Sequence, residues 1–556
     1  MAVQAQGNGD DYPKMIILRK IILPLLFFLF ITGIFVVCTN SIQKKINRMK
    51  VVEKLTDTDP VDNAPPIVAF TTVALGSFRG LVADLLWLRS ISLQDKGQYF
   101  EMVQLASWIT KLQPRFTGAT AYLAWNMAYN ISVTFSSAED RWRWIKRGIE
   151  LIRDEALVYN PADPVLYKEL GWIYQHKVGN IMDDANIYYK NQIALELMDV
   201  FGCPEPDWKA LAAAPDNEEQ FKKLCNEKDP IWKALKSSEY NSLDALEKEF
   251  RANRKLPDKF TALVKNAAEI KLIEDYFRKR WLKQRYKLDS AKILEINNRF
   301  GKLDWRLPEA HAIYWATLGL EHQNTSEPDI NCDRMITQSL ADAFKGGRLL
   351  MFDKNNFKSF MSAPNLNVAD AVKKNFQDVY ERQKSKSFLA GFENFMVDAI
   401  VILYNYGNYT KAKKYLEELR KLFPGHPRYK VDVDEFVLKE WLEDAKEGTM
   451  KQIMDIIDGL IFRSLYFLSY GDTDAALAHE KLAQGVYLHY KQSQNESWGR
   501  VGLPPYPEIK QKIVNNCLTN FPKPVAESLR SALEEQKELK KEDQPLPKDK
   551  NSSFLK

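Results

Sequence analysis

Apolar residues recur at intervals of three and four along most of the chain from Phe78 onward, and this spacing limits the possible folds more than any other feature. It places apolar side chains on one face of an α-helix, whereas a strand requires strict alternation. Short breaks at Pro, Asn or Gly divide the pattern into pieces of helix length. Aromatic residues make up 12% of the chain, which suits large side chains that interlock between helices. We therefore expect an all-α fold with little β-sheet.

One spacing recurs within these helices. Tyr167, Leu170, Gly171 and Tyr174 place a large ring, a small residue and another ring on a single helical face. The spacing partly repeats over residues 122–129. Repetition of this kind indicates helix pairs that pack against one another in series.

The segment 395–424 is the clearest copy, because Ala412 and Pro424 stand as far apart as in a standard unit. These features resemble the tetratricopeptide repeat (TPR) superfamily, in which helix pairs of about 34 residues stack side by side. Further helix pairs are expected at 308–350 and 455–490, with different loop lengths. The resemblance implies an α-solenoid of helical hairpins, whose concave surface binds an extended segment or a helix of another protein.

The stretch from Ile21 to Gln43 contains no charged residue and is almost continuously apolar as far as Cys38. At 1.5 Å per residue this length approaches the roughly 30 Å thickness of a bilayer core. A cleaved signal peptide is the alternative, but the stretch exceeds the usual apolar length and lacks a small-x-small site. We therefore predict one transmembrane helix at 21–43.

Basic residues flank both ends of this span, so the distribution of positive charge does not decide its orientation in the membrane. An uncleaved signal-anchor leaves its short tail inside the cell and sends the rest across. We accordingly expect a single-pass protein of the cytoplasmic (inner) membrane with an extracytoplasmic body. The five cysteines form no CxxC motif and do not settle the compartment.

The expected organisation has eight parts. In chain order they are an N-terminal tail (1–20), the transmembrane helix (21–43), a juxtamembrane stalk (44–77), TPR-like repeats (78–203), a charged helical insert (204–300), degenerate helical repeats (301–390), C-terminal TPR-like repeats (391–533) and a disordered tail (534–556).

The sequence shows little sign of catalysis. It lacks GxxxxGK[ST], GxGxxG, HExxH and GxSxG, and its six histidines are scattered. Glu309, near a predicted helix start, is the least implausible catalytic acid, although its position also suits the positive end of a helix. We expect no enzyme activity, no metal and no cofactor.

Two sets of residues are candidates for binding. The groove-facing positions of the expected repeats are Asn130, Lys168, Trp172, Gln175, His176, Asn394, Tyr404 and Asn405. A basic run could hold an anionic surface through Arg278, Arg280, Lys283 and Lys287. The alternative for the basic run is a solvated helix anchored by its aromatic side.

These observations predict a membrane-anchored scaffold that binds protein partners in its groove. Two alternatives stay open: an enzyme of cell-envelope glycans on an α-superhelical scaffold, and a secretion or folding assistant that binds exported chains. The net charge of +5 is too small to favour nucleic acid as a partner. The sequence does not indicate an oligomeric state.

Overall fold

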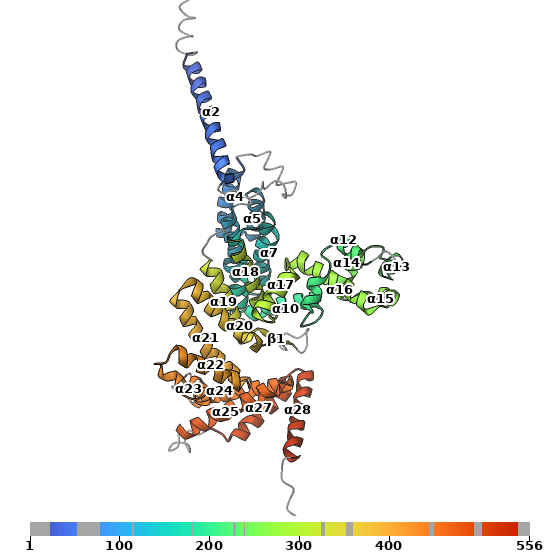
Figure 1. Cartoon of the computed structure of the whole chain (residues 1–556), viewed down its shortest axis with the longest axis vertical. Coiled ribbons are helices and arrows are strands. Elements are labelled where there is room, and N and C mark those ends of the chain that lie inside the picture. Colours follow the sequence, from blue (N-terminus) through green and yellow to red (C-terminus); the bar gives the residue numbers. More distant parts are fainter. Residues whose placement is uncertain are drawn as a thin grey trace, which may run out of the picture. The chain divides into compact units, whose positions relative to one another are not determined.

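The computed structural model describes ten stretches of the chain, and they are almost entirely helical (Figure 1). They are residues 23–52, 78–113, 116–180, 182–225, 230–237, 240–323, 329–351, 360–443, 450–493 and 503–542. The chain divides into two compact units, Met1–Leu81 and Val82–Lys556, which are described separately. Many packed helices confirm the all-α prediction.

The first unit contains the helix α2, Leu23–Val52. Its described apolar side chains are exposed, for example Phe30 (67%) and Phe35 (72%). The helix runs beyond Gln43, where we expected the stalk to begin, and residues 53–77 lie outside the described stretches.

Among the described residues, the helix that is both long and apolar enough to cross a membrane is α21 (Lys386–Asn405). Half of its apolar window is buried inside the protein, as in a core helix. The apolar part of α2, Leu26–Ile42, is shorter. The described helices are therefore weak evidence for a membrane span.

A series of helices joined by short turns follows, and the first of them crosses the boundary between the two units. They are α4 (Phe78–Asp95), α5 (Tyr99–Leu112), α6 (Thr117–Trp125), η2 (Asn126–Ile131), η3 (Ser132–Thr134), α7 (Ala138–Glu150), η4 (Leu151–Ala156), α8 (Leu157–Tyr159), α9 (Pro164–Trp172), η5 (Ile173–Gly179) and α10 (Asn186–Phe201). Local sequence sets their starts: the Ser137 hydroxyl accepts from the Asp140 N–H, and Asp163 caps α9 directly before Pro164.

Two glycines allow these helices to approach closely. A Cβ at Gly148 of α7 would lie 2.7 Å from the Ala124 carbonyl oxygen of α6. A Cβ at Gly171 of α9 would lie 2.6 Å from the Met335 sulfur and 3.3 Å from the Ala312 oxygen. The small residue of the ring-small-ring spacing is thus a packing requirement.

The region expected as an insert is helical. Its elements are α11 (Trp208–Ala213), α12 (Glu218–Leu224), α13 (Pro230–Ser237), α14 (Leu243–Asn253), α15 (Asp258–Val264), α16 (Ala267–Trp281), η6 (Leu282–Tyr286) and α17 (Ser290–Phe300). Apolar side chains from Phe221 to Phe277 form a core separate from the main one.

The helices after the insert pack against helices that precede it in the chain. Buried α18 (Pro308–Glu321) packs against α9 and against α19 (Ile330–Gly346). A short antiparallel ladder follows, β1 (Arg348–Met351) with β2 (Phe360–Ala363), in which Arg348 pairs with Ala363.

The remaining helices continue the main core, and α21 packs between α20 and α22. In order they are η8 (Leu366–Val368), α20 (Ala369–Gln383), α21, α22 (Tyr409–Leu422), η9 (Pro427–Tyr429), α23 (Val433–Glu443), α24 (Met450–Ser469), α25 (Thr473–Ser493), α27 (Tyr506–Asn520) and α28 (Lys523–Glu542). α28 extends past Glu534, where we expected the disordered tail to begin.

Candidate binding groove

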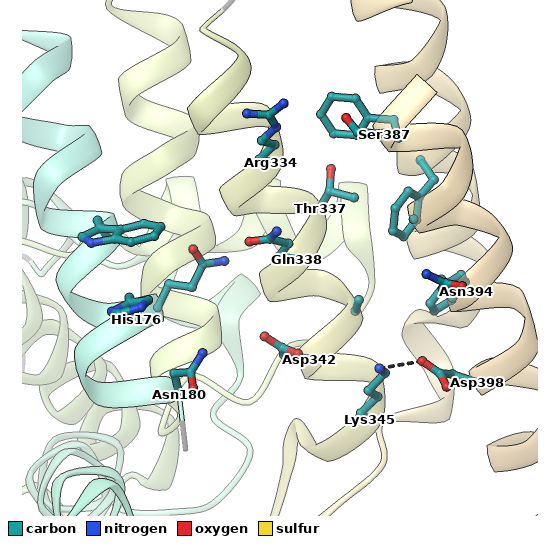
Figure 2. A pocket seen from close by; sticks show the side chains of 17 residues that line it. His176, Asn180, Arg334, Thr337, Gln338, Asp342, Lys345, Ser387, Asn394 and Asp398 are labelled. Atoms are coloured by element: carbon teal, nitrogen blue, oxygen red, sulfur yellow. Dashed lines mark ion pairs between the residues drawn. The ribbon is translucent and has the colours of Figure 1, made fainter. Parts of the chain in front are cut away.

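A groove runs along α19, between a wall formed by α9 and η5 and a wall formed by α21 (Figure 2). It consists of two hollows of about 470 Å³ and 380 Å³, which adjoin because both are lined by Trp172, Gln175, Arg334 and Gln338. We call this feature the α19 groove. It joins helices that are about 160 residues apart in the sequence.

Polar side chains of α19 form the floor. Arg334, Gln338, Asp342 and Lys345 recur at three- and four-residue spacing and point into the groove (Figure 2). The opposite face of the same helix is buried in the core, for example at Leu340 and Phe344. The amphipathic character of α19 therefore fixes which of its residues are offered to a ligand.

The α9–η5 wall is tied to the floor by Gln175. Its side-chain amide donates to the Met335 carbonyl oxygen (3.1 Å) and to the Ser339 hydroxyl (3.0 Å). Beside it, the rings of Trp172 and His176 stack with centroids 4.7 Å apart. Trp172 is 37% exposed, so part of this wall is an accessible aromatic surface.

The α21 wall contributes Phe388, Gly391, Asn394 and Asp398. Asp398 forms an ion pair with Lys345 of the floor, with 2.6 Å between Nζ and Oδ2. The charge of this lysine is therefore balanced by a carboxylate of the same chain, in a pair that is exposed to solvent.

Arg334 differs from Lys345, because within the described stretches it has no hydrogen bond or ion pair. It lies where the two hollows meet, close to Trp172. Burial raises the pKa of Asp342 above its ordinary value. Burial and the nearby charge of Lys177 lower the pKa of His176. Arg334 is therefore a cation on the groove floor without a partner among the described residues, and the carboxylate of Asp342 lies on the same face of α19.

Aromatic rings lead away from the groove along the first helices, each with its centroid 4.7–6.4 Å from the next. In order they are Trp172, His176, Tyr129, Trp125, Tyr122 and Trp87. We call this series the aromatic ladder. Its members Tyr122 and Trp125 are 44% and 36% exposed, so the apolar surface continues beyond the groove.

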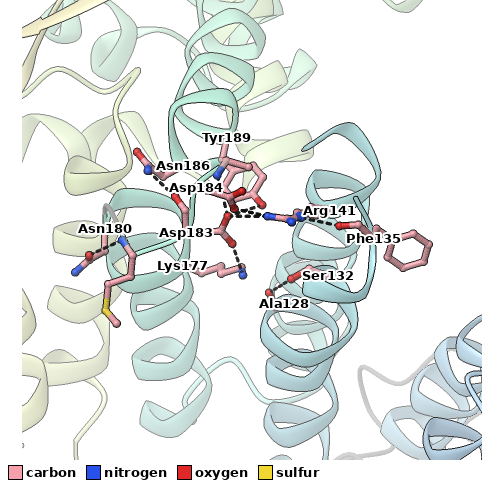
Figure 3. A network of polar contacts seen from close by, with 12 residues as sticks. Ala128, Ser132, Phe135, Arg141, Lys177, Asn180, Asp183, Asp184, Asn186 and Tyr189 are labelled. Atoms are coloured by element: carbon pink, nitrogen blue, oxygen red, sulfur yellow. Dashed lines mark hydrogen bonds and ion pairs between the residues drawn. The ribbon is translucent and has the colours of Figure 1, made fainter. Parts of the chain in front are cut away.

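The turn below the groove is held by buried charges (Figure 3). Asp183 accepts from Lys177 (2.6 Å) and Tyr189 (3.2 Å), and Arg141 pairs with Asp183 and with Asp184. Burial alone raises the pKa of Asp183, but hydrogen bonds from Lys177 and the Ala185 N–H outweigh it and lower this pKa overall. The network fixes the end of η5, next to the groove residue Asn180.

Five of the predicted groove residues line the α19 groove. They are Lys168, Trp172, Gln175, His176 and Asn394. Lys168 lies 3.3 Å from Glu169, and Asn394 is exposed on α21.

The other three lie elsewhere. Asn130 is exposed beside the aromatic ladder and donates to the Asn126 side chain at 2.5 Å. Tyr404 and Asn405 are buried at the end of α21, where α23 and α25 pack against this helix. The Tyr404 hydroxyl donates to Asp434 of α23.

Sequence reasoning missed the floor of the groove. Arg334, Gln338 and Asp342 lie in a region where the repeat spacing is weak, so no repeat position pointed to them. The available signal was the polar stripe itself, in which Arg334, Gln338 and Asp342 recur every fourth residue on a helix whose opposite face is buried.

The basic run is largely engaged within the protein. Arg278 donates to the Val200 carbonyl oxygen (2.6 Å), and Arg280 lies 3.1 Å from both Asp244 and Glu247. Lys283 is 3.9 Å from Asp216, and Lys287 donates to the Gln284 carbonyl oxygen (3.0 Å). Arg280 therefore holds helices of the insert together, whereas Arg278 fastens the insert to α10. Lys283, with its side chain 57% exposed, is open to solvent.

Glu309 lines neither hollow of the groove. It is 9% exposed, and its Oε1 lies 3.4 Å from Lys190 Nζ. Burial raises its pKa. The described part of the chain contains no group of three or more His, Cys, Asp or Glu placed to hold a metal ion.

A larger hollow of about 920 Å³ lies beside β1 and the start of the insert. Its buried polar side chains serve the fold: Arg306 pairs with Asp304 and donates to the Leu349 carbonyl oxygen, and Asn297 accepts from Trp305. The α19 groove is the better candidate, because its central arginine has no such partner among the described residues.

No protein-family model matches the chain, and no curated protein sequence is significantly similar to it.

Proposed function

We propose that this protein is a single-pass, membrane-anchored scaffold of TPR-like helix pairs, which binds an extended segment of another protein in the α19 groove. The observation that supports this most is Arg334, a cation on the groove floor that has no partner among the described residues and lies beside the half-exposed ring of Trp172. Exposed aromatic rings and arginines are the side chains that most often dominate the energy of protein interfaces.

The polar and apolar groups that line the groove also suit a bound peptide. Amides and hydroxyls on the floor and walls can pair with the backbone of an extended chain, while the partly exposed ring of Trp172 offers an apolar contact. The membrane part of the proposal is supported by α2, a helix whose described apolar side chains are exposed along Leu26–Ile42. We further propose that the body is extracytoplasmic, which reporter fusions after Lys556 would test.

The groove is tested by placing a photoreactive benzoylphenylalanine at Gln338 of the full-length protein in its native cell. The same probe at Lys414, which is exposed on α22 outside the groove, is the matched control. We expect discrete adducts from Gln338 that are absent from Lys414. When Arg334→Ala or Trp172→Ala is added to the Gln338 variant, the adduct should fall at least severalfold.

Other outcomes are equally informative. Identical adducts from both positions, or an adduct unaffected by either alanine, would reject the groove as the binding site. Adducts with many unrelated exported chains would favour a secretion or folding assistant over a dedicated scaffold.

A further inference from the structure

Helix α4 is apolar on two opposite faces. Its inner face is buried in the helical body at Ala83 (0% exposed) and Leu93 (5%). Its outer face presents Leu81, Leu85 and Leu88, which are 57%, 58% and 62% exposed. These three leucines are spaced by four and three residues and therefore form one stripe. We call it the leucine stripe.

An exposed apolar face on a helix whose opposite face is already buried in the body calls for a second covering. The surroundings add to the apolar surface: the ring of Trp87 on α4 contacts Phe116 (6.1 Å) and Tyr122 (5.3 Å). These two rings are 41% and 44% exposed. The outer face of α4 is thus an apolar surface that nothing within the described stretches covers.

We propose that the leucine stripe lies in the interfacial region of the lipid bilayer. This inference rests on the membrane anchoring proposed above. In the sequence, α4 is the first described helix after α2, and the 25 residues from 53 to 77 separate them. Even a fully extended connection of that length spans at most about 90 Å. Within that distance α4 can reach the surface of the bilayer.

The composition of the surface favours lipid. Leu, Phe and Tyr are side chains that enter the interface between headgroups and acyl chains. Asp84 and Arg89 are both exposed on α4, and Arg89 pairs with Glu101. The charges are mixed, so attraction to anionic headgroups is not the driving force. Attachment is therefore insensitive to salt.

A second copy of the chain is a poorer occupant. The exposed parts of the three leucines, Phe116 and Tyr122 together come to roughly 500 Å², below the approximately 800 Å² per partner of a standard protein interface. Insertion into a bilayer has no such minimum, because each apolar side chain contributes separately.

The test is spin labelling of the full-length protein in phosphatidylcholine nanodiscs. Cysteine is introduced by Leu85→Cys, after the exposed Cys38 and Cys203 are changed to serine. Phe30→Cys on α2 reports the anchor, and Lys414→Cys reports the aqueous surface. All three positions are exposed, so the labels leave the core intact. Power-saturation EPR then compares the accessibility of each label to oxygen and to a water-soluble nickel chelate.

We expect the oxygen-to-nickel ratio at Leu85→Cys to exceed that at Lys414→Cys severalfold and to persist at high salt. A ratio equal to that of Lys414→Cys would overturn the proposal, and so would a label shielded from both reagents, because protein would then cover the stripe. The Phe30→Cys label distinguishes a failure of the proposed anchor from a failure of the proposed docking of α4. If it is in lipid while Leu85→Cys is in water, the anchor stands and the docking fails; if Phe30→Cys is in water, the anchor fails.

Discussion

Asp183 holds the turn below the α19 groove through its contacts with Lys177, Arg141 and Tyr189. The side chains of Asp183 and Lys177 are only 8% and 5% exposed, so each charge depends on the other. Removing one partner of such a pair leaves an uncompensated charge in the interior.

We predict that Asp183→Asn lowers the free energy of unfolding by about 3 kcal/mol, because Lys177 keeps its charge and loses its counter-ion. Urea unfolding followed by circular dichroism measures the change. Asp184→Asn is the control, since the side chain of Asp184 is 82% exposed and its loss should cost about 0.5 kcal/mol or less. Equal effects of the two substitutions would contradict the assigned role.

Two buried histidines make the fold sensitive to mild acid. Burial lowers the pKa of both His311 and His479 to about 4, from an ordinary value of 6.5. His311 is 2% exposed and His479 is 1% exposed, and each bonds a backbone carbonyl oxygen. Below pH 6.5 the unfolded chain binds protons that the folded chain does not.

We therefore predict that stability is highest above pH 6.5 and falls between pH 6.5 and 4, by up to about 1.4 kcal/mol per pH unit for each histidine. His479→Gln should flatten this dependence, whereas His426→Gln, at an exposed position, should leave it unchanged. Chemical unfolding of the wild type and both variants across this pH range measures the dependence of the free energy of unfolding on pH. A wild-type stability that stays constant down to pH 4.5 would refute the prediction.

At the scale of elements, glycines set the distances between helices. Gly148 faces a backbone oxygen of α6, whereas the nearest neighbour of Gly171 is the sulfur of Met335, a flexible side chain. A Cβ added at Gly459 of α24 would have nothing within 4 Å. The same substitution should therefore have three different effects.

Gly148→Ala should destabilise the protein by about 1–3 kcal/mol, because two helix backbones must separate. Gly171→Ala should cost less, since Met335 can move. Gly459→Ala should stabilise by about 0.5–1 kcal/mol, because alanine restricts the unfolded chain and favours the helix. Thermal unfolding of the three variants gives the order, and a Gly148→Ala variant at least as stable as the wild type would disprove the close approach.

At the scale of the whole molecule, the insert has a hydrophobic core of its own. Phe250 is fully buried there, with its ring 5.6 Å from that of Phe277 and 5.1 Å from the Arg278 guanidinium. A separate core allows the insert to open while the main core stays closed.

We predict that Phe250→Ala destabilises the insert by about 3–5 kcal/mol. Hydrogen exchange followed by mass spectrometry should then show faster exchange in α14 and α16 and unchanged exchange in α24 and α25. Leu263→Ala is the control, because Leu263 is 47% exposed on α15. Faster exchange throughout the chain would show that the two cores unfold together.

The sequence by itself determined those features of the structure that depend on residues close together in the chain. The three- and four-residue spacing predicted the helices, and Gly171 between its two tyrosines predicted a close helix contact. It also placed Lys168, Trp172, Gln175 and His176 on one face, because a helix fixes the directions of side chains a few residues apart.

Only the tertiary structure decided which helices meet. Gln175 reaches α19 across 160 residues, so no local pattern could show that Arg334 would complete the groove. Tyr404 and Asn405 have groove-facing positions in the repeat pattern, yet helices that follow in the chain cover them. The spacing of apolar residues shows which face of a helix will be buried. Which other helix covers that face depends on packing over the whole chain.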